Sequence, residues 1–209
     1  MTESNENLLD LSVHDFVAAA AAKTPTPGGG SVAGVVAALG VALGEMTLNF
    51  TRGKKRFAEH AAYHDHLAER LARARQMFQD LVAEDVQAYQ LYQAAQRTDD
   101  GPEKDQAVQL ATAAAINVPR EVTKLALAVL ADLKELGGKC NTWLITDLLA
   151  SAALCVAAAR LSDYNVRINV PSVADEAAAK DIHHSSASDL AKAQDLLEQI
   201  EAAAKEFLP

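Results

Sequence analysis

Residues 57–96 carry one uninterrupted helical pattern, and this pattern is the strongest constraint on the fold. Apolar side chains recur along one broad face, among them Leu67, Leu71, Phe78, Leu81 and Val82. Spacings of three and four residues are typical of an amphipathic α-helix. Elsewhere, no alternating pattern typical of a strand runs beyond about five residues. We therefore expect an all-α fold, a helical bundle with one long helix.

Further helices are expected at 8–22, 31–51, 102–136, 142–161 and 175–207. The helix over 31–51 is apolar on nearly all sides and is expected at the centre of the bundle.

Three features should interrupt these helices. Pro119 should kink or restart the helix that contains it, because proline cannot donate the intrahelical hydrogen bond. Residues 162–172 are expected to be irregular with a short extended piece, since their apolar residues alternate with polar ones. The polar run HHSSAS at 183–188 is a candidate break in the last helix.

With 209 residues, the chain has the length of one domain. We treat 1–209 as a single helical domain and expect 1–7 to be a flexible tail. A formal net charge of −9 argues against binding to duplex nucleic acid, which requires a basic surface.

Cellular location is read from two features. The two cysteines give no disulfide framework, and the first ten residues lack the basic and apolar regions of a signal peptide. A cytoplasmic protein is expected. The apolar stretch Ser31–Gly44 is shorter than the roughly 20 residues of a membrane span, which favours a buried helix and no membrane partner.

PTPGGGS at 25–31 is the most unusual segment. Consecutive glycines let a ligand approach the backbone, and the free N–H groups of the helix beginning near Ser31 can bind an anion or a carbonyl oxygen. The alternative is a tight connection between helices. Three glycines cost more chain entropy than a connection needs, so binding is favoured. A dinucleotide site is rejected because no strand precedes the glycines.

A cluster of basic residues follows the second helix: Arg52, Lys54, Lys55 and Arg56. It is either a solvated turn or a site that captures carboxylates.

Two carboxylates are candidates for proton transfer. Asp85, in LVAEDVQAY, borders the apolar face of its helix, and Asp147 lies between Ile145 and Leu148 in an apolar helix. A partly buried carboxyl with a raised pKa can act as an acid or a base near neutral pH. The alternative for each is an ordinary solvated carboxylate.

No metal site is expected. His60 and His64 have the i, i+4 spacing that can bind a metal, but no third ligand is evident, and exposed histidines are favoured.

Several of these segments, in this order, resemble the cyclodeaminase/cyclohydrolase family of folate enzymes. The resemblance rests on HDFVAAAAAKTPTPGGGSVAGVVAALGVALGEM, TRGKKRF, EDVQAY, NVPREV, CNTWLITDL and YNVRINV, and it spans about Ser12 to His184. The chain departs from the family pattern at Cys140, where the family has glycine, and at Thr146, where it has serine.

The resemblance implies a helical homodimer that binds a tetrahydrofolate derivative, with or without a polyglutamate tail, and needs no metal, nucleotide or redox cofactor. It implies catalytic roles for Asp85, Asp147 and Lys54. The substrate-binding residues are expected to be Pro27, Gly28, Gly29, Gly30, Ser31, Lys55, Asn141 and Asn165.

The expected chemistry takes place at the bridge between N5, carbon and N10 of tetrahydrofolate. Hydrolysis of 5,10-methenyltetrahydrofolate to 10-formyltetrahydrofolate is placed first. The alternative is formiminotetrahydrofolate cyclodeaminase activity, which releases ammonia. A remote alternative is a non-catalytic folate-binding or assembly module. Either reaction requires a carboxyl that shuttles protons and a second charge that tunes it.

Overall fold

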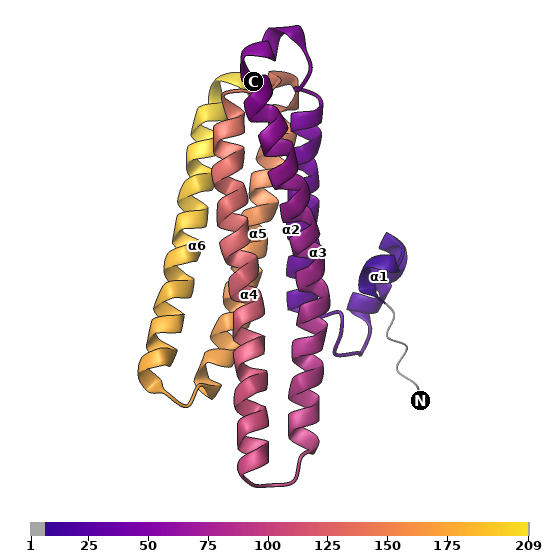
Figure 1. Cartoon of the computed structure of the whole chain (residues 1–209), viewed down its shortest axis with the longest axis vertical. Coiled ribbons are helices and arrows are strands. Elements are labelled where there is room, and N and C mark those ends of the chain that lie inside the picture. Colours follow the sequence, from indigo (N-terminus) through magenta and orange to yellow (C-terminus); the bar gives the residue numbers. More distant parts are fainter. Residues whose placement is uncertain (1–6, 209) are drawn as a thin grey trace.

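A computed structural model describes residues 7–208, and in that part of the chain the regular structure is entirely helical. Figure 1 shows the long helices packed in an up-and-down bundle, with the short α1 apart from them. The α-helices are α1 (Val13–Ala21), α2 (Gly29–Asn49), α3 (Ala61–Arg97), α4 (Pro102–Gly137), α5 (Ile145–Asn169) and α6 (Glu176–Ala204). Short 3-10 helices are η1 (Leu8–Asp10), η2 (Lys55–His60), η3 (Thr142–Leu144), η4 (Val170–Ser172) and η5 (Lys205–Phe207). The expected all-α bundle is confirmed.

The bundle is a ring of four helices with a fifth on one edge. Helix α2 packs against α3 and α5, α4 completes the ring, and α6 lies against α4 and α5. Fully buried side chains such as Phe78, Leu130 and Leu148 fill the space between them. Close approach of α2 and α5 depends on Gly40, where an added Cβ would lie 3.1 Å from the Ser151 carbonyl oxygen.

The outer surface of α2 is apolar yet has no covering helix. Leu39 and Phe50 are 56% and 54% exposed. The expected central helix is therefore enclosed on one side only within a single chain. By length and composition, Gly29–Asn49 and Thr142–Ser172 could each cross a membrane, a test that core helices of soluble proteins also pass.

Helix α1 has no buried residue and stands away from the bundle (Figure 1). Ser12 caps its N-terminus by accepting a hydrogen bond from the Asp15 N–H. Its apolar side chains Val13 and Val17 are exposed. The flexible tail expected for 1–7 lies outside the described residues except Asn7, whose side chain caps η1.

Pro119 does not stop or restart α4, which is continuous through it. The proline leaves the Ala115 carbonyl without its intrahelical donor. The Asn169 side-chain amide donates to this carbonyl over 3.4 Å and to the Asn165 carbonyl over 2.8 Å. A neighbouring helix thus supplies the hydrogen bond that proline removes.

The irregular segment expected at 162–172 is wrong: α5 continues to Asn169 and ends in η4. Val166 and Val170 pack with Ile116 in a small second core, at the i, i+4 spacing of a helix, whereas Ile168 is exposed. The alternation of apolar and polar residues suggests the two-residue period of a strand. The burial of these residues follows the helical period instead.

The candidate break at 183–188 is also wrong, because α6 runs through it. The Ser186 hydroxyl donates to the buried carboxylate of Asp163 over 2.7 Å, which fastens this polar stretch to α5. One turn further, Asp189 pairs with Lys124 of α4 at 2.5 Å. These contacts give the buried Ser186 and Asp189 side chains partners while the backbone remains helical.

Candidate active site

The sequence-predicted residues fall into two clusters at opposite ends of α2. The glycine-turn cluster comprises Pro27, Gly28, Gly29, Gly30, Ser31, Asp85 and Asn165. The basic-turn cluster comprises Lys54, Lys55, Arg56, Asn141 and Asp147. Helix α2 has 21 residues, so the clusters are ~30 Å apart in one chain at 1.5 Å per residue.

At the glycine-turn cluster, the carboxylate of Asp85 reaches from α3 to the first turn of α2. The Ser31 hydroxyl donates to Asp85 Oδ2 over 2.7 Å. Gly28 is the N-cap residue of α2 and offers no side-chain cap. The first N–H groups of a helix need acceptors, and an anion is stabilised there. Asp85 therefore occupies the anion position that the sequence suggested for a ligand.

Gly30 makes this approach possible. A Cβ added at Gly30 would lie 1.9 Å from Asp85 Oδ1, inside the contact distance of any real side chain. A Cβ at Gly29 would meet only the Asn165 side chain, at an ordinary 3.6 Å. Only the third glycine of the turn is therefore required by the packing of Asp85. Pro27, which follows a cis peptide bond, is buried beside the turn.

Burial raises the pKa of Asp85 above its ordinary value, and hydrogen bonds from the Ser31 side chain and backbone oppose this rise. The sequence placed Asp85 at the border of the apolar face, and the structure confirms a half-buried position there. A carboxyl with a raised pKa can both accept and release a proton near neutral pH.

Asn165 lies on α5 opposite Gly29. Its side-chain amide donates to the Leu161 carbonyl over 2.9 Å, a bond within its own helix. The Asn165 residue is half-buried, and both polar atoms of its amide lie near Gly29.

Of the basic residues Arg52, Lys54, Lys55 and Arg56 around the basic-turn cluster, the two arginines are already engaged. Arg52 pairs with Asp65 at 3.0 Å, and Arg56 donates to the buried side chain of Asn141. Lys54 and Lys55 are exposed and form no ion pair within residues 7–208. These two lysines are the cations that a bound anion could reach.

Asn141 joins the basic turn to the start of α5. Its backbone N–H donates to the Thr51 hydroxyl over 2.9 Å, and its side-chain oxygen caps η3. Asp147 follows in the first turn of α5 and is half-buried. Next to it, Trp143 is 85% exposed, an unusual position for an indole ring.

The structure does not bring Asp85 and Asp147 together within one chain. Asn141 ties the start of α5 to the end of the bundle where α3 begins, and Asp85 is 24 residues along α3 from Ala61, ~36 Å at helical rise.

The expectation of exposed histidines is wrong for His64, and His60 is half-buried. His64 is buried, and its Nε2 lies 2.9 Å from the Lys139 carbonyl oxygen. Within 7–208, no group of three His, Cys, Asp or Glu side chains could bind a metal.

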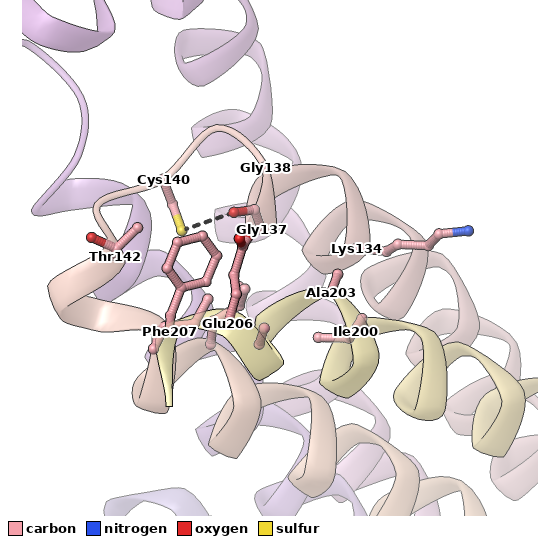
Figure 2. Close-up of a pocket in the computed structure, with 12 residues that line it drawn as sticks. Lys134, Gly137, Gly138, Cys140, Thr142, Ile200, Ala203, Glu206 and Phe207 are labelled. Carbon is pink, nitrogen blue, oxygen red and sulfur yellow. Dashed lines mark hydrogen bonds between the residues drawn. The ribbon is translucent and has the colours of Figure 1, made fainter. Parts of the chain in front are cut away.

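A cavity of about 330 Å³ lies at the basic-turn end, beneath the C-terminal residues. Figure 2 shows Cys140 and Phe207 facing each other across it, with Gly137 and Thr142 beside them. Burial raises the pKa of the Cys140 thiol to about 11, which keeps the thiol protonated and unreactive. The residues that line the cavity include neither candidate carboxylate and none of the candidate lysines.

Sequence reasoning missed the contacts between residues distant along the chain. The bond from Ser31 to Asp85 and the bond from Arg56 to Asn141 join positions 54 and 85 residues apart. One signal was available for the first: a helix that begins at glycines has no side-chain cap of its own and needs an acceptor from elsewhere.

Known proteins resemble this chain over nearly its whole length. Residues 12–188 match the family model described as formiminotransferase-cyclodeaminase. A methenyltetrahydrofolate cyclohydrolase of Methylorubrum extorquens is 28% identical over 176 residues, which cover 81% of this chain and 84% of that protein. A formimidoyltransferase-cyclodeaminase of Mus musculus is 29% identical over 90% of this chain, but this chain spans only 36% of that protein's length.

The crystal structure of formiminotetrahydrofolate cyclodeaminase from Thermotoga maritima has the same fold. It superposes with a TM-score of 0.87 at 28% identity and covers 95% of this chain and 98% of that one. Sequence motifs, fold and the collinear match agree, and the chain belongs to the formiminotransferase-cyclodeaminase family.

Proposed function

We propose that this protein hydrolyses 5,10-methenyltetrahydrofolate to 10-formyltetrahydrofolate. The observation that carries the proposal is Asp85, a half-buried carboxyl with a raised pKa in the region matched to a folate enzyme. The match to the Methylorubrum cyclohydrolase, a protein of similar length, favours this reaction.

Asp85 performs both proton transfers in this proposal. It takes a proton from water as the water oxygen bonds to the bridge carbon. The resulting tetrahedral intermediate opens by breaking the bond from carbon to N5, and Asp85 returns the proton to N5. The hydroxyl on the bridge carbon loses its own proton to solvent as the formyl C=O forms, so the reaction releases one proton overall. A group that acts first as base and then as acid needs a pKa near the working pH. Burial raises the pKa of Asp85 in that direction.

The second candidate is formiminotetrahydrofolate cyclodeaminase activity, favoured by the match to the Thermotoga structure. N10 would attack the formimino carbon and Asp85 would protonate the departing ammonia. Neither reaction transfers electrons, and we propose that no metal, nucleotide or redox cofactor takes part.

Lys54, Lys55 and Asp147 are too far from Asp85 in one chain to act at the same site. They can contribute to the site at Asp85 only if two chains associate. In a two-fold dimer with antiparallel α2 helices, the glycine-turn cluster of one subunit meets the basic-turn cluster of its partner. The uncovered apolar face of α2, with Leu39 and Phe50, is the surface that such pairing buries. We therefore propose a homodimer in which Lys54 of one subunit orients the folate bound at Asp85 of the other, and the lysines attract the glutamate tail.

Two buried thiols and a formal net charge of −9 support a cytoplasmic enzyme without nucleic-acid or membrane partners. This location, like the polyglutamate preference, is part of the proposal.

The test measures two reactions in parallel with purified protein. Loss of methenyltetrahydrofolate absorbance would identify the cyclohydrolase, and ammonia release from formiminotetrahydrofolate would identify the cyclodeaminase. Tight folate binding with neither reaction would establish the non-catalytic alternative. Neither binding nor turnover would overturn the proposed function.

A further inference from the structure

Ser31 lies where a bound substrate cannot readily touch it. It is fully buried in the first turn of α2, and its hydroxyl is engaged by Asp85 at 2.7 Å. Gly29 beside it is exposed and Gly30 is half-exposed. The glycines therefore offer backbone to a ligand, whereas Ser31 offers its hydroxyl to the protein.

We propose that Ser31 is a positioning residue for Asp85 and not a substrate-binding residue, an inference that rests on the proposed function. Its hydroxyl holds Oδ2 and leaves Oδ1 over Gly30 as the oxygen that exchanges protons. Gly30 and Ser31 thus act together: one makes room for the carboxylate and the other fixes its rotation.

Among residues 7–208, no charged side chain is bonded to Asp85 alongside Ser31. The first half of α2 carries no charge, and the α5 residue facing the turn is the uncharged Asn165. On α3, the adjacent Glu84 is exposed.

Arg167, on the same stretch of α5, is paired with Asp163. Burial of Asp85 and the hydrogen bonds from Ser31 are the influences on its pKa, and they act in opposite directions. Ser31 is therefore the one group whose removal shifts the protonation of Asp85 without adding or removing a charge.

Ser31→Ala tests the assignment. The variant removes a hydrogen bond to the ionised carboxylate, so the pKa of Asp85 should rise and a higher pH should be needed to form the base. One hydrogen bond to a charged group corresponds to about a tenfold loss of rate on the acidic side of the pH–rate profile. The loss should diminish as the pH is raised.

Ser151→Ala is the matched control. Ser151 is also fully buried against α2, and its hydroxyl donates to the Gly40 carbonyl over 2.6 Å. This variant loses a buried hydroxyl of the same kind, so it should lower the melting temperature similarly and leave the shape of the pH–rate profile unchanged.

A second readout does not depend on activity. NMR titration of carboxyl carbons in aspartate-labelled protein, with Asp85 assigned from Asp85→Asn, should show its midpoint moving to higher pH in Ser31→Ala. An unmoved midpoint would overturn the positioning role whatever the enzyme catalyses. Inactive wild-type protein with a shifted midpoint would instead contradict the proposed function and leave the role of Ser31 intact.

Discussion

The two ends of α2 are built in opposite ways. At the glycine turn, Asp85 and Ser31 are bonded to each other inside one chain, and burial controls the chemistry of the carboxyl. At the basic turn, Lys54 and Lys55 are exposed to solvent, as is the ring of Trp143 in η3. The carboxylate at the glycine turn is therefore held by contacts within one chain, whereas the lysines at the basic turn remain exposed to solvent.

The largest expected effect tests whether the two ends work together across subunits. Asp85→Asn and Lys54→Met should each be severely impaired; a positioned acid or base contributes roughly 10²–10⁴ in rate. Mixing the two variants and allowing subunits to exchange should restore about a quarter of wild-type activity, because half of the dimers are mixed and each keeps one intact site.

The control for this mixing experiment is a pair of variants at the same end. Asp85→Asn mixed with Gly30→Ala should recover nothing, since every site then carries one damaged glycine-turn cluster. No recovery in the first mixture would show that each subunit contains its complete site. Recovery in the control would contradict the assignment of Gly30 and Asp85 to one cluster.

Next in size is the comparison of Gly30→Ala with Gly29→Ala. The first should reduce turnover by roughly 10²-fold or more, because its methyl group displaces the Asp85 carboxylate. The second places its methyl at an ordinary contact distance and should retain most activity. Steady-state kinetics of both variants measure the two turnover rates. Equal losses of turnover in both variants would mean that the turn is needed for its shape alone.

A smaller effect separates the two free lysines. Lys54→Met should reduce the maximal rate at all salt concentrations, because a cation in contact with the substrate is poorly screened. Lys55→Met should mainly raise the apparent substrate constant for polyglutamylated folate at low salt, since attraction over a distance is screened within about 10 Å at 0.1 M. If added salt erased both deficits, Lys54 would have no orienting role.

The smallest expected effect concerns stability. A buried carboxyl with a raised pKa holds its proton more tightly in the folded protein than in the unfolded chain. Its contribution to folding is therefore lost as the pH rises from the unfolded pKa through the folded pKa. Asp85→Asn removes the cost of keeping an ionised carboxylate half-buried at pH 7. At this pH, the melting temperature of the variant should be equal to that of wild type or a few degrees higher. Thermal unfolding at pH 5 and pH 7 measures the difference, and a lower melting temperature at both would contradict it.

The helical fold could be predicted from the sequence because apolar spacing over Leu67–Val82 is a local property. The errors arose where tertiary contacts decide. The segment 162–172 is helical because Val166 packs against Ile116 and Asn169 bonds to α4. His64 is buried because a loop 75 residues away supplies its hydrogen-bond partner.

The candidate site could be predicted only residue by residue. The border position of Asp85 was visible from its neighbours in the helix. Its bond to Ser31 was not, since the two are 54 positions apart. The separation of the two clusters could not be predicted either. It depends on the direction in which each helix runs through the bundle, and no local sequence pattern specifies that direction.

The uncovered face of α2 also bears on how the protein behaves when it is scarce. An isolated chain exposes Leu39 and Phe50 to water, together with the short helix α1, which has no buried residue. Short helices without tertiary contacts are marginal in water, and exposed apolar patches promote association. If the active form is the proposed dimer, newly made chains must associate before they become active. The total activity should then rise more steeply than in proportion to the concentration of the protein.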